Sequence, residues 1–134
     1  MTLSEISSVL LTREVIVCLI VGTIGGIIIG ALPGLSASMG VALMIPVTYS
    51  MSPVAAIVML SAIYTSAIYG GSITASLINT PGTPASAATA MDGFALTKRG
   101  EGLKAIGVCT IASMIGGTFS AIMLLVMAEP LARI

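Results

Sequence analysis

A long tract without charge limits how this chain can fold more than any other feature. No Asp, Glu, Lys or Arg occurs at 15–91, and a second charge-free tract covers 105–128. Charged residues make up 7% of the sequence and hydrophobic residues 57%, whereas soluble domains carry roughly 25% charged residues. So few charges could not cover the surface of a water-soluble domain. The sequence therefore predicts an integral membrane protein embedded in a lipid bilayer.

The charged side chains gather in three short stretches, at 5–14, 92–104 and 129–133. These stretches mark where the chain leaves the apolar phase, and with zero net charge the pattern indicates no nucleic-acid partner. The first fourteen residues are too polar for the hydrophobic region of a signal peptide, so we expect the N-terminus to be retained. Three basic residues in the hydrophilic loop expected at 92–104 place that loop in the cytoplasm by the positive-inside rule.

Reactive side chains are scarce and isolated. The chain has no His, its serines lack a Lys or His partner in the apolar tracts, and Asp92 lacks the second aspartate of an intramembrane protease. Cys18 and Cys109 lie inside apolar tracts, where a thiol packs as a small hydrophobe rather than binding metal or forming a disulfide. We therefore expect no catalytic site, no metal site and no cofactor.

Five apolar segments divide the chain, which we treat as one membrane domain, 1–134. We expect them at 15–32, 36–49, 54–69, 73–91 and 105–128. The first is about 27 Å long as a helix, close to the roughly 30 Å of a hydrocarbon core. Within it Gly26 and Gly30 have the small-xxx-small spacing that lets a second helix approach closely, and the last segment repeats this spacing. The fold class predicted is an all-α, multi-span helical bundle.

Proline and glycine interrupt this bundle at membrane depth. Pro33 lacks a backbone donor and disfavours helical geometry in the residue before it, while Gly34 tolerates positive φ. The second interruption, at 79–84, divides the fourth segment into two half-helices. We therefore expect two discontinuous or re-entrant helices, as in one half of an inverted-repeat transporter.

Three weaker signals mark the ends of segments. Pro46 is expected to interrupt the second segment. The pair Ser52-Pro53 favours a helix start, because proline suits the first helical position. The run YGGS at 69–72 favours a helix end, since glycine commonly stops helices.

The two breaks carry groups that suit a small anion and a cation. Freed backbone groups are costly in hydrocarbon unless protein or a water-filled cavity satisfies them. Free N–H groups at a helix start favour a carboxylate, whereas free carbonyls favour a cation. The candidate substrate-binding residues are Asn79, Thr80, Pro81, Gly82, Thr83, Pro84 and Ser86 at the second break and Pro33, Gly34, Ser36 and Ser38 at the first. The candidate ligands of a coupling cation are Ser72, Thr74 and Gly34.

Spacing suggests that the two breaks face each other across one site, with a helix starting at Thr83-Pro84. The plainer interpretation of any single hydroxyl is a bond back to its own helix. For the cluster around Asn79 as a whole, we favour a functional role.

Five blocks of sequence resemble one known family. They are GALPGL at 30–35, YGGSITA at 69–75, NTPGTPAS at 79–86, TAMDGF at 89–94 and KRGE at 98–101. In order and spacing they resemble the large membrane subunit of tripartite tricarboxylate transporters, the TctA family. Two positions depart from the usual pattern: Ser76 stands where most members have Leu, adding polarity near the proposed site, and Met91 stands where Leu precedes the aspartate.

The resemblance implies a function and partners. Such a subunit takes up citrate or related small carboxylates across the bacterial inner membrane by secondary transport, driven by an ion gradient. Its partners are a small membrane subunit and a periplasmic substrate-binding protein. Family members are several times longer than this chain and contain two related halves, so the chain resembles the N-terminal portion of such a subunit.

Two questions stay open at the level of sequence. The absence of an acid within 15–91 favours Na⁺ over H⁺ as the coupling ion, held by carbonyls and hydroxyls. The rival function is a membrane scaffold or assembly protein that transports nothing, in which the breaks merely permit tight packing.

Overall fold

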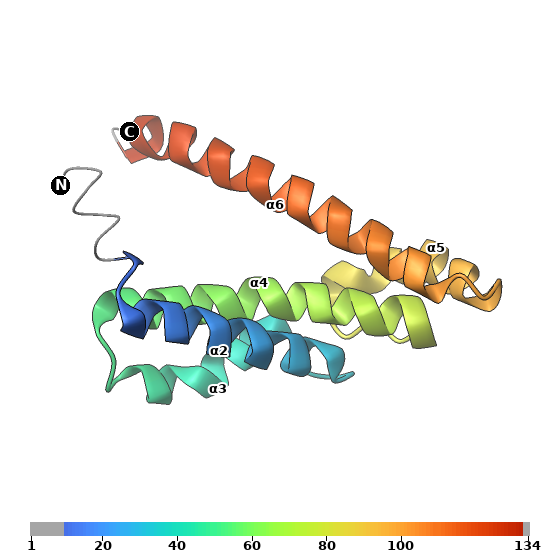
Figure 1. Ribbon diagram of the computed structural model, residues 1–134, viewed down its shortest axis with the longest axis horizontal. Helices are drawn as coiled ribbons and strands as arrows, with labels where there is room; N and C mark the ends of the chain where they lie inside the picture. The colour runs from blue at the N-terminus through green and yellow to red at the C-terminus, as the bar shows by residue number, and fades with distance from the viewer. Residues whose placement is uncertain (1–9, 133–134) are drawn as a thin grey trace.

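The computed structural model describes residues 10–132, and its regular secondary structure over that range is helical (Figure 1). Its elements are α2 (Arg13–Ala31), α3 (Ala37–Thr48), α4 (Pro53–Ile78), the 3₁₀ helix η1 (Pro84–Ser86), α5 (Ala87–Lys98) and α6 (Gly102–Ala132). Our expectation about the N-terminus falls largely on residues 1–9, which lie outside the described range. Three helices, α2, α4 and most of α6, are long and apolar enough to cross a membrane. The all-helical, multi-span character predicted from the sequence is thus confirmed.

Helix α4 is central, because it contacts each of the other described helices (Figure 1). It lies parallel to α2, and glycines on α2 let the two backbones approach. A Cβ added at Gly22 would lie 2.8 Å from the Met59 carbonyl oxygen, and one at Gly26 would lie 2.5 Å from that of Ile63. Side chains cannot occupy such gaps, so this face of α2 requires glycine. The close approach predicted from Gly26 and Gly30 is confirmed.

A carboxylate joins the N-terminal ends of α2 and α4. Glu14 accepts hydrogen bonds from the backbone N–H and from the hydroxyl of Ser52, each at 3.1 Å. Ser52 is the N-cap of α4, so the acidic side chain also lies at the positive end of that helix. A buried cluster beneath this contact includes Cys18, Met59 and Ile63, and Cys18 is therefore a packing residue as predicted.

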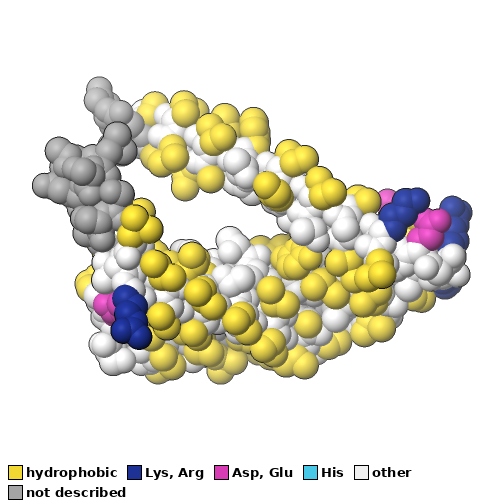
Figure 2. All heavy atoms as spheres, in the orientation of Figure 1, with side chains coloured by type: hydrophobic (Ala, Val, Ile, Leu, Met, Phe, Trp, Pro, Cys, Tyr) yellow, Lys and Arg dark blue, Asp and Glu magenta, His cyan; other side chains and the backbone are white. Residues whose placement is uncertain are grey.

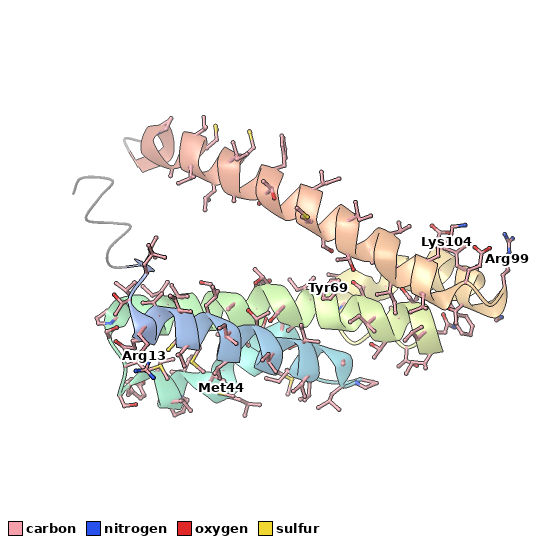
Figure 3. The ribbon with its side chains drawn as sticks, in the orientation of Figure 1. Arg13, Met44, Tyr69, Arg99 and Lys104 are labelled. Atoms are coloured by element: carbon pink, nitrogen blue, oxygen red, sulfur yellow. The ribbon has the colours of Figure 1, made fainter. Side chains whose placement is uncertain are left out.

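The charged side chains that the structure describes lie at the two ends of the molecule (Figure 2). Arg13 marks one end, and Arg99 and Lys104 mark the other, at the turn between α5 and α6 (Figure 3). The faces of α2, α4 and α6 between them carry many exposed large hydrophobic side chains. Such a charge-free middle is the surface expected of a protein surrounded by lipid.

Helix α4 contradicts the helix end predicted at 69–72. The segments expected at 54–69 and 73–78 form one helix that starts at Pro53, as Ser52-Pro53 indicated, and continues to Ile78. Gly70 and Gly71 are present because neighbouring backbone comes close: a Cβ at Gly71 would lie 2.9 Å from the Thr83 nitrogen. The glycine pair therefore serves packing within a helix rather than a stop.

Three further boundaries also differ from expectation. The loop predicted at 92–104 is mostly helix, since α5 continues to Lys98 and α6 starts at Gly102. Pro46 lies inside α3, in its last turn, where little helix remains to be disrupted. The hydroxyl of Thr48 donates to the Ile45 carbonyl at 2.7 Å and helps to satisfy that turn. Helix α6 exceeds the predicted 105–128 at both ends.

Candidate functional site

The two predicted breaks lie against each other in the structure. The first is the link between α2 and α3, where Gly34 has φ +96°, and the second is the non-helical stretch between α4 and η1. A Cβ at Gly82 would collide with the Gly30 carbonyl oxygen at the end of α2 and would lie 3.0 Å from the Gly71 Cα. The second break therefore passes over the end of α2 at a distance that only glycine permits.

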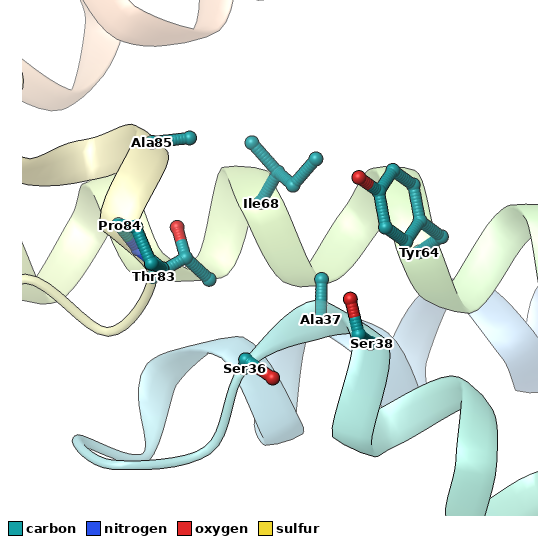
Figure 4. A pocket seen from close by; sticks show the side chains of 8 residues that line it. All are labelled: Ser36, Ala37, Ser38, Tyr64, Ile68, Thr83, Pro84 and Ala85. Carbon is teal, nitrogen blue, oxygen red and sulfur yellow. The ribbon is translucent and has the colours of Figure 1, made fainter.

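Two adjoining cavities lie between the breaks. One measures about 230 Å³ and is lined by Ser36, Ala37, Ser38, Tyr64, Ile68, Thr83, Pro84 and Ala85 (Figure 4). The other measures about 340 Å³ and is lined by Gly34, Ser36, Pro81, Gly82, Thr83 and Pro84. The shared lining residues come from both breaks. The spatial part of the sequence prediction, that the breaks face one another, therefore agrees with the structure.

Two helix starts meet at these cavities. Ser36 is the N-cap of α3, and its hydroxyl accepts a hydrogen bond from the Met39 N–H at 3.2 Å. Thr83 is the N-cap of η1, with Pro84 at the first helical position as predicted. First-turn N–H groups have no acceptor within their own helix, and the helix dipole makes this end positive. Residues from both helix starts line the same cavities.

Three backbone donors at these helix starts are free. Within residues 10–132, the N–H groups of Ala37, Ser38 and Ala85 have no hydrogen-bond acceptor. All three residues line the smaller cavity. Among the described residues no charged side chain lines either cavity, so their contribution to the local field comes from backbone dipoles and hydroxyls. Such an arrangement favours an anion that accepts several hydrogen bonds.

The hydroxyls around the cavities divide into free and engaged groups. Ser38 and Tyr64 line the smaller cavity, and their hydroxyls bond to no other described residue. Ser86 is 1% exposed, accepts from the Thr83 N–H at 3.3 Å and donates to the Thr83 carbonyl at 2.7 Å. The Ser86 hydroxyl thus closes the helix start, as the plainer interpretation expected, and it lines neither cavity.

Comparison with known proteins decides the family. The family model of the tripartite tricarboxylate transporter TctA family matches residues 16–134. The chain belongs to the TctA family. It is also 40% identical over 124 residues to an uncharacterized 52.8 kDa protein from the TAR-I ttuC' 3' region of Agrobacterium vitis. That match covers 92% of the chain and 25% of the relative, so the chain spans about a quarter of the relative's length. No solved structure matches the chain.

TctA is a family of transporters rather than of enzymes, and the described residues hold no cluster of His, Cys, Asp or Glu able to bind a metal. Among the five sequence blocks that suggested the family, NTPGTPAS supplies Pro81, Gly82, Thr83, Pro84 and Ala85 to the cavities. The block GALPGL supplies Gly34. Family membership and cavity geometry thus converge on the same two stretches of chain.

The start of the TctA block NTPGTPAS lies apart from the cavities. Asn79 is the exposed C-cap of α4 in the left-handed conformation, with φ 56°. Thr80 is exposed, and its hydroxyl donates to the Ile78 carbonyl at 3.3 Å. Neither residue lines either cavity. The backbone conformation alone explains why asparagine occupies position 79, since asparagine tolerates the left-handed region better than most residues.

The predicted cation ligands are not gathered around one space. Ser72 donates to the Ile68 carbonyl at 3.3 Å and Thr74 to the Gly71 carbonyl at 3.1 Å, both within α4. Only Gly34 of the three lines a described cavity. Pro33, a predicted substrate residue, is exposed in the first break and lines neither cavity. Cation binding by Ser72 and Thr74 stays a prediction.

The structure gives two residues positions that the sequence did not indicate. Tyr64 was missed, because a tyrosine in an apolar span gives no signal by itself; only a continuous α4 places Tyr64, Ile68 and Gly71 on one face toward the breaks. Ser76 was expected to add polarity near the site. It is instead fully buried, 3.9 Å from the Cys109 sulfur, and lies where Gly93 has no room for a Cβ.

Proposed function

We propose that this chain forms part of the substrate path of a TctA-family membrane subunit and that the cavities between its breaks bind a carboxylate group. The substrate is citrate or a related small carboxylate, taken up across the bacterial inner membrane. Uptake is secondary active transport driven by a Na⁺ or H⁺ gradient. A small membrane subunit and a periplasmic substrate-binding protein complete the system.

One observation carries the carboxylate assignment. Three residues with free N–H groups at the starts of α3 and η1, Ala37, Ser38 and Ala85, line one cavity of about 230 Å³. Carboxylate oxygens accept such hydrogen bonds, and bonds to charged groups are stronger than neutral ones. The hydroxyls of Ser38 and Tyr64 add donors at the same wall. The part of the chain that the structure describes places no cationic side chain there, which favours binding weak enough to permit release.

The architecture of the complete transporter extends this proposal. A site between broken helices is typical of transporters built from inverted repeats, in which one half moves against the other. The two breaks described here would supply one half of that site, and the remaining length found in the relative would supply the other. Under the same proposal, the turn between α5 and α6, with its basic residues, lies in the cytoplasm.

Removal of a single backbone donor tests the proposal. In Ala37→Pro, proline occupies the first position of α3, where it is well tolerated, and the preceding Ser36 already has the extended geometry that proline demands (φ −82°, ψ 157°). The change deletes one N–H group. We expect the KM for citrate uptake to rise about 10- to 100-fold, since a bond to a charged group contributes about 1.5–3 kcal/mol.

The matched control is Ala37→Val, which adds bulk but keeps the N–H group. Uptake of radiolabelled citrate would be measured in cells that express the full-length subunit with both partners, together with the amount of inserted protein. A scaffold protein would show no citrate uptake at all, and there the proline variant would alter only protein amount. Equal KM values in the proline and valine variants would refute carboxylate binding at this helix start.

A further inference from the structure

Helix α6 separates from the rest of the molecule after a short region of contact. The hydroxyls of Tyr69 on α4 and Thr110 on α6 lie 2.7 Å apart, and beyond this point the two helices diverge (Figure 1). Between them lies a groove of about 540 Å³, seen as an opening through the molecule in Figure 2. Its lining consists of Thr65 from α4 and Gly117, Ser120, Ala121, Met123, Leu124 and Met127 from α6.

Small side chains on α6 form part of the wall of this groove. Gly117, Ser120 and Ala121 line it, and their spacing of three and four residues places them on one helix face. Three larger side chains, those of Met123, Leu124 and Met127, line the next stretch of the groove along α6. Helices in membranes use small residues where another backbone approaches, whereas contact with lipid requires no such selection.

A hydroxyl in the groove supports the same interpretation. Thr110 and Thr118 satisfy their hydroxyls within α6, by donating to the Ile106 and Met114 carbonyls at 2.8 and 2.7 Å. The Ser120 hydroxyl has no hydrogen-bond partner among the described residues. In hydrocarbon an unpaired hydroxyl is unfavourable, and hydroxyls between helices commonly bond across the contact.

We propose that this groove holds a membrane-spanning helix from the remaining part of the full-length polypeptide. The chain spans 25% of its Agrobacterium relative, so most of such a protein lies outside the part described. None of the apolar window of α6 is buried within the structure. A helix of the same polypeptide is tethered nearby and competes favourably with a second molecule because its effective concentration is high. This inference does not depend on which substrate is carried.

Two adjacent leucines provide a matched test. Leu124 lines the groove and Leu125 does not, and the two side chains are similarly exposed, at 70% and 78%. A photoreactive diazirine analogue of leucine would be placed at either position of the full-length protein in its native membrane, then activated by light. Mass spectrometry would map the products. We expect position 124 to cross-link to a peptide beyond residue 134 of the same polypeptide, and position 125 to give only lipid adducts.

Several outcomes would overturn the proposal. Products of doubled mass at 124 would identify a second copy, and lipid adducts alone would identify a lipid-filled groove. Cross-links from 124 to α4 would mean that the groove closes, and a polypeptide that ends at Ile134 in its membrane would supply no helix to fill it. A second measurement compares Ala121→Phe with Ile122→Phe: only the groove variant should lower the melting temperature of the purified full-length protein.

Discussion

Helices α2 and α6 share the same small-residue spacing but differ in what that spacing contacts. On α2, a Cβ at Gly22 or Gly26 would approach the backbone of α4 to within 3 Å. On α6, a Cβ added at Gly116 or Gly117 would meet no atom of the described residues within 4 Å. Small residues therefore permit close packing without causing it, because the approach also needs a complementary helix. The difference suggests that α2 has its partner within this chain and that the partner of α6 lies outside it.

The strongest test of the comparison substitutes neighbouring glycines on α2. Gly26→Ala places a Cβ 2.5 Å from the Ile63 carbonyl oxygen, whereas Gly25→Ala meets nothing within 4 Å. We expect Gly26→Ala to lower stability by about 3 kcal/mol or more, since overpacking against backbone cannot relax. Gly25→Ala should be neutral or stabilising by up to about 1 kcal/mol, because alanine is the better helix former.

Thermal unfolding of the full-length protein in detergent, with the amount of inserted protein, measures both variants. Similar behaviour of Gly26→Ala and Gly25→Ala would show that α2 is no more closely packed than α6, and the contrast between the helices would be lost.

The next test concerns Gly71, where α4 packs closely against Thr83, a residue that lines both cavities. Gly71→Ala puts a Cβ 2.8 Å from the Thr83 hydroxyl oxygen, so the N-cap of η1 must shift. We expect a loss of about 1–3 kcal/mol in stability and a higher KM for citrate. Gly107→Ala on α6, with nothing within 4 Å, is the control and should leave the KM unchanged. An unaltered KM in Gly71→Ala would show that the close contact between α4 and Thr83 does not affect substrate binding in the cavity.

A smaller effect is expected at the end of α4. Asn79 adopts φ 56°, so Asn79→Ala should cost about 1 kcal/mol, since alanine is strained in this conformation. Asn79→Gly removes the amide but keeps the conformation, and it should preserve citrate uptake. The sequence alone indicated the opposite, a substrate-binding amide. Loss of uptake in both variants, with normal amounts of inserted protein, would restore that interpretation.

The smallest effect is expected on α6 itself. Gly116 on α6 does not line the groove, and an added Cβ would meet nothing within 4 Å among the described residues. Gly116→Ala should therefore change stability by no more than about 1 kcal/mol, in the stabilising direction. Melting of the full-length protein provides the measurement. A loss of about 2 kcal/mol or more would mean that this face of α6, outside the groove, is also packed as closely as α2, and the contrast between the two helices would be lost.

Much of the helical framework follows from local sequence. The charge-free tracts require helices in a membrane, because hydrocarbon offers no other partner for backbone groups. Pro33 and Gly34 end one helix, and Pro53 and Pro84 begin others, because proline fixes φ and lacks a donor. These boundaries depend on neighbouring residues only, and the TctA family could also be inferred from local blocks of sequence.

Only the tertiary structure decided what the glycines and breaks contact. Gly70 and Gly71 are typical of a helix end, yet α4 continues through them because other backbone passes close by. Tyr64 gained a place at the cavity from that continuity. Two helix starts distant in sequence meet at one space because Gly82 can pass over Gly30. Such contacts depend on the distances between segments that are far apart in the sequence. Those distances are set by tertiary packing and cannot be read from the local sequence.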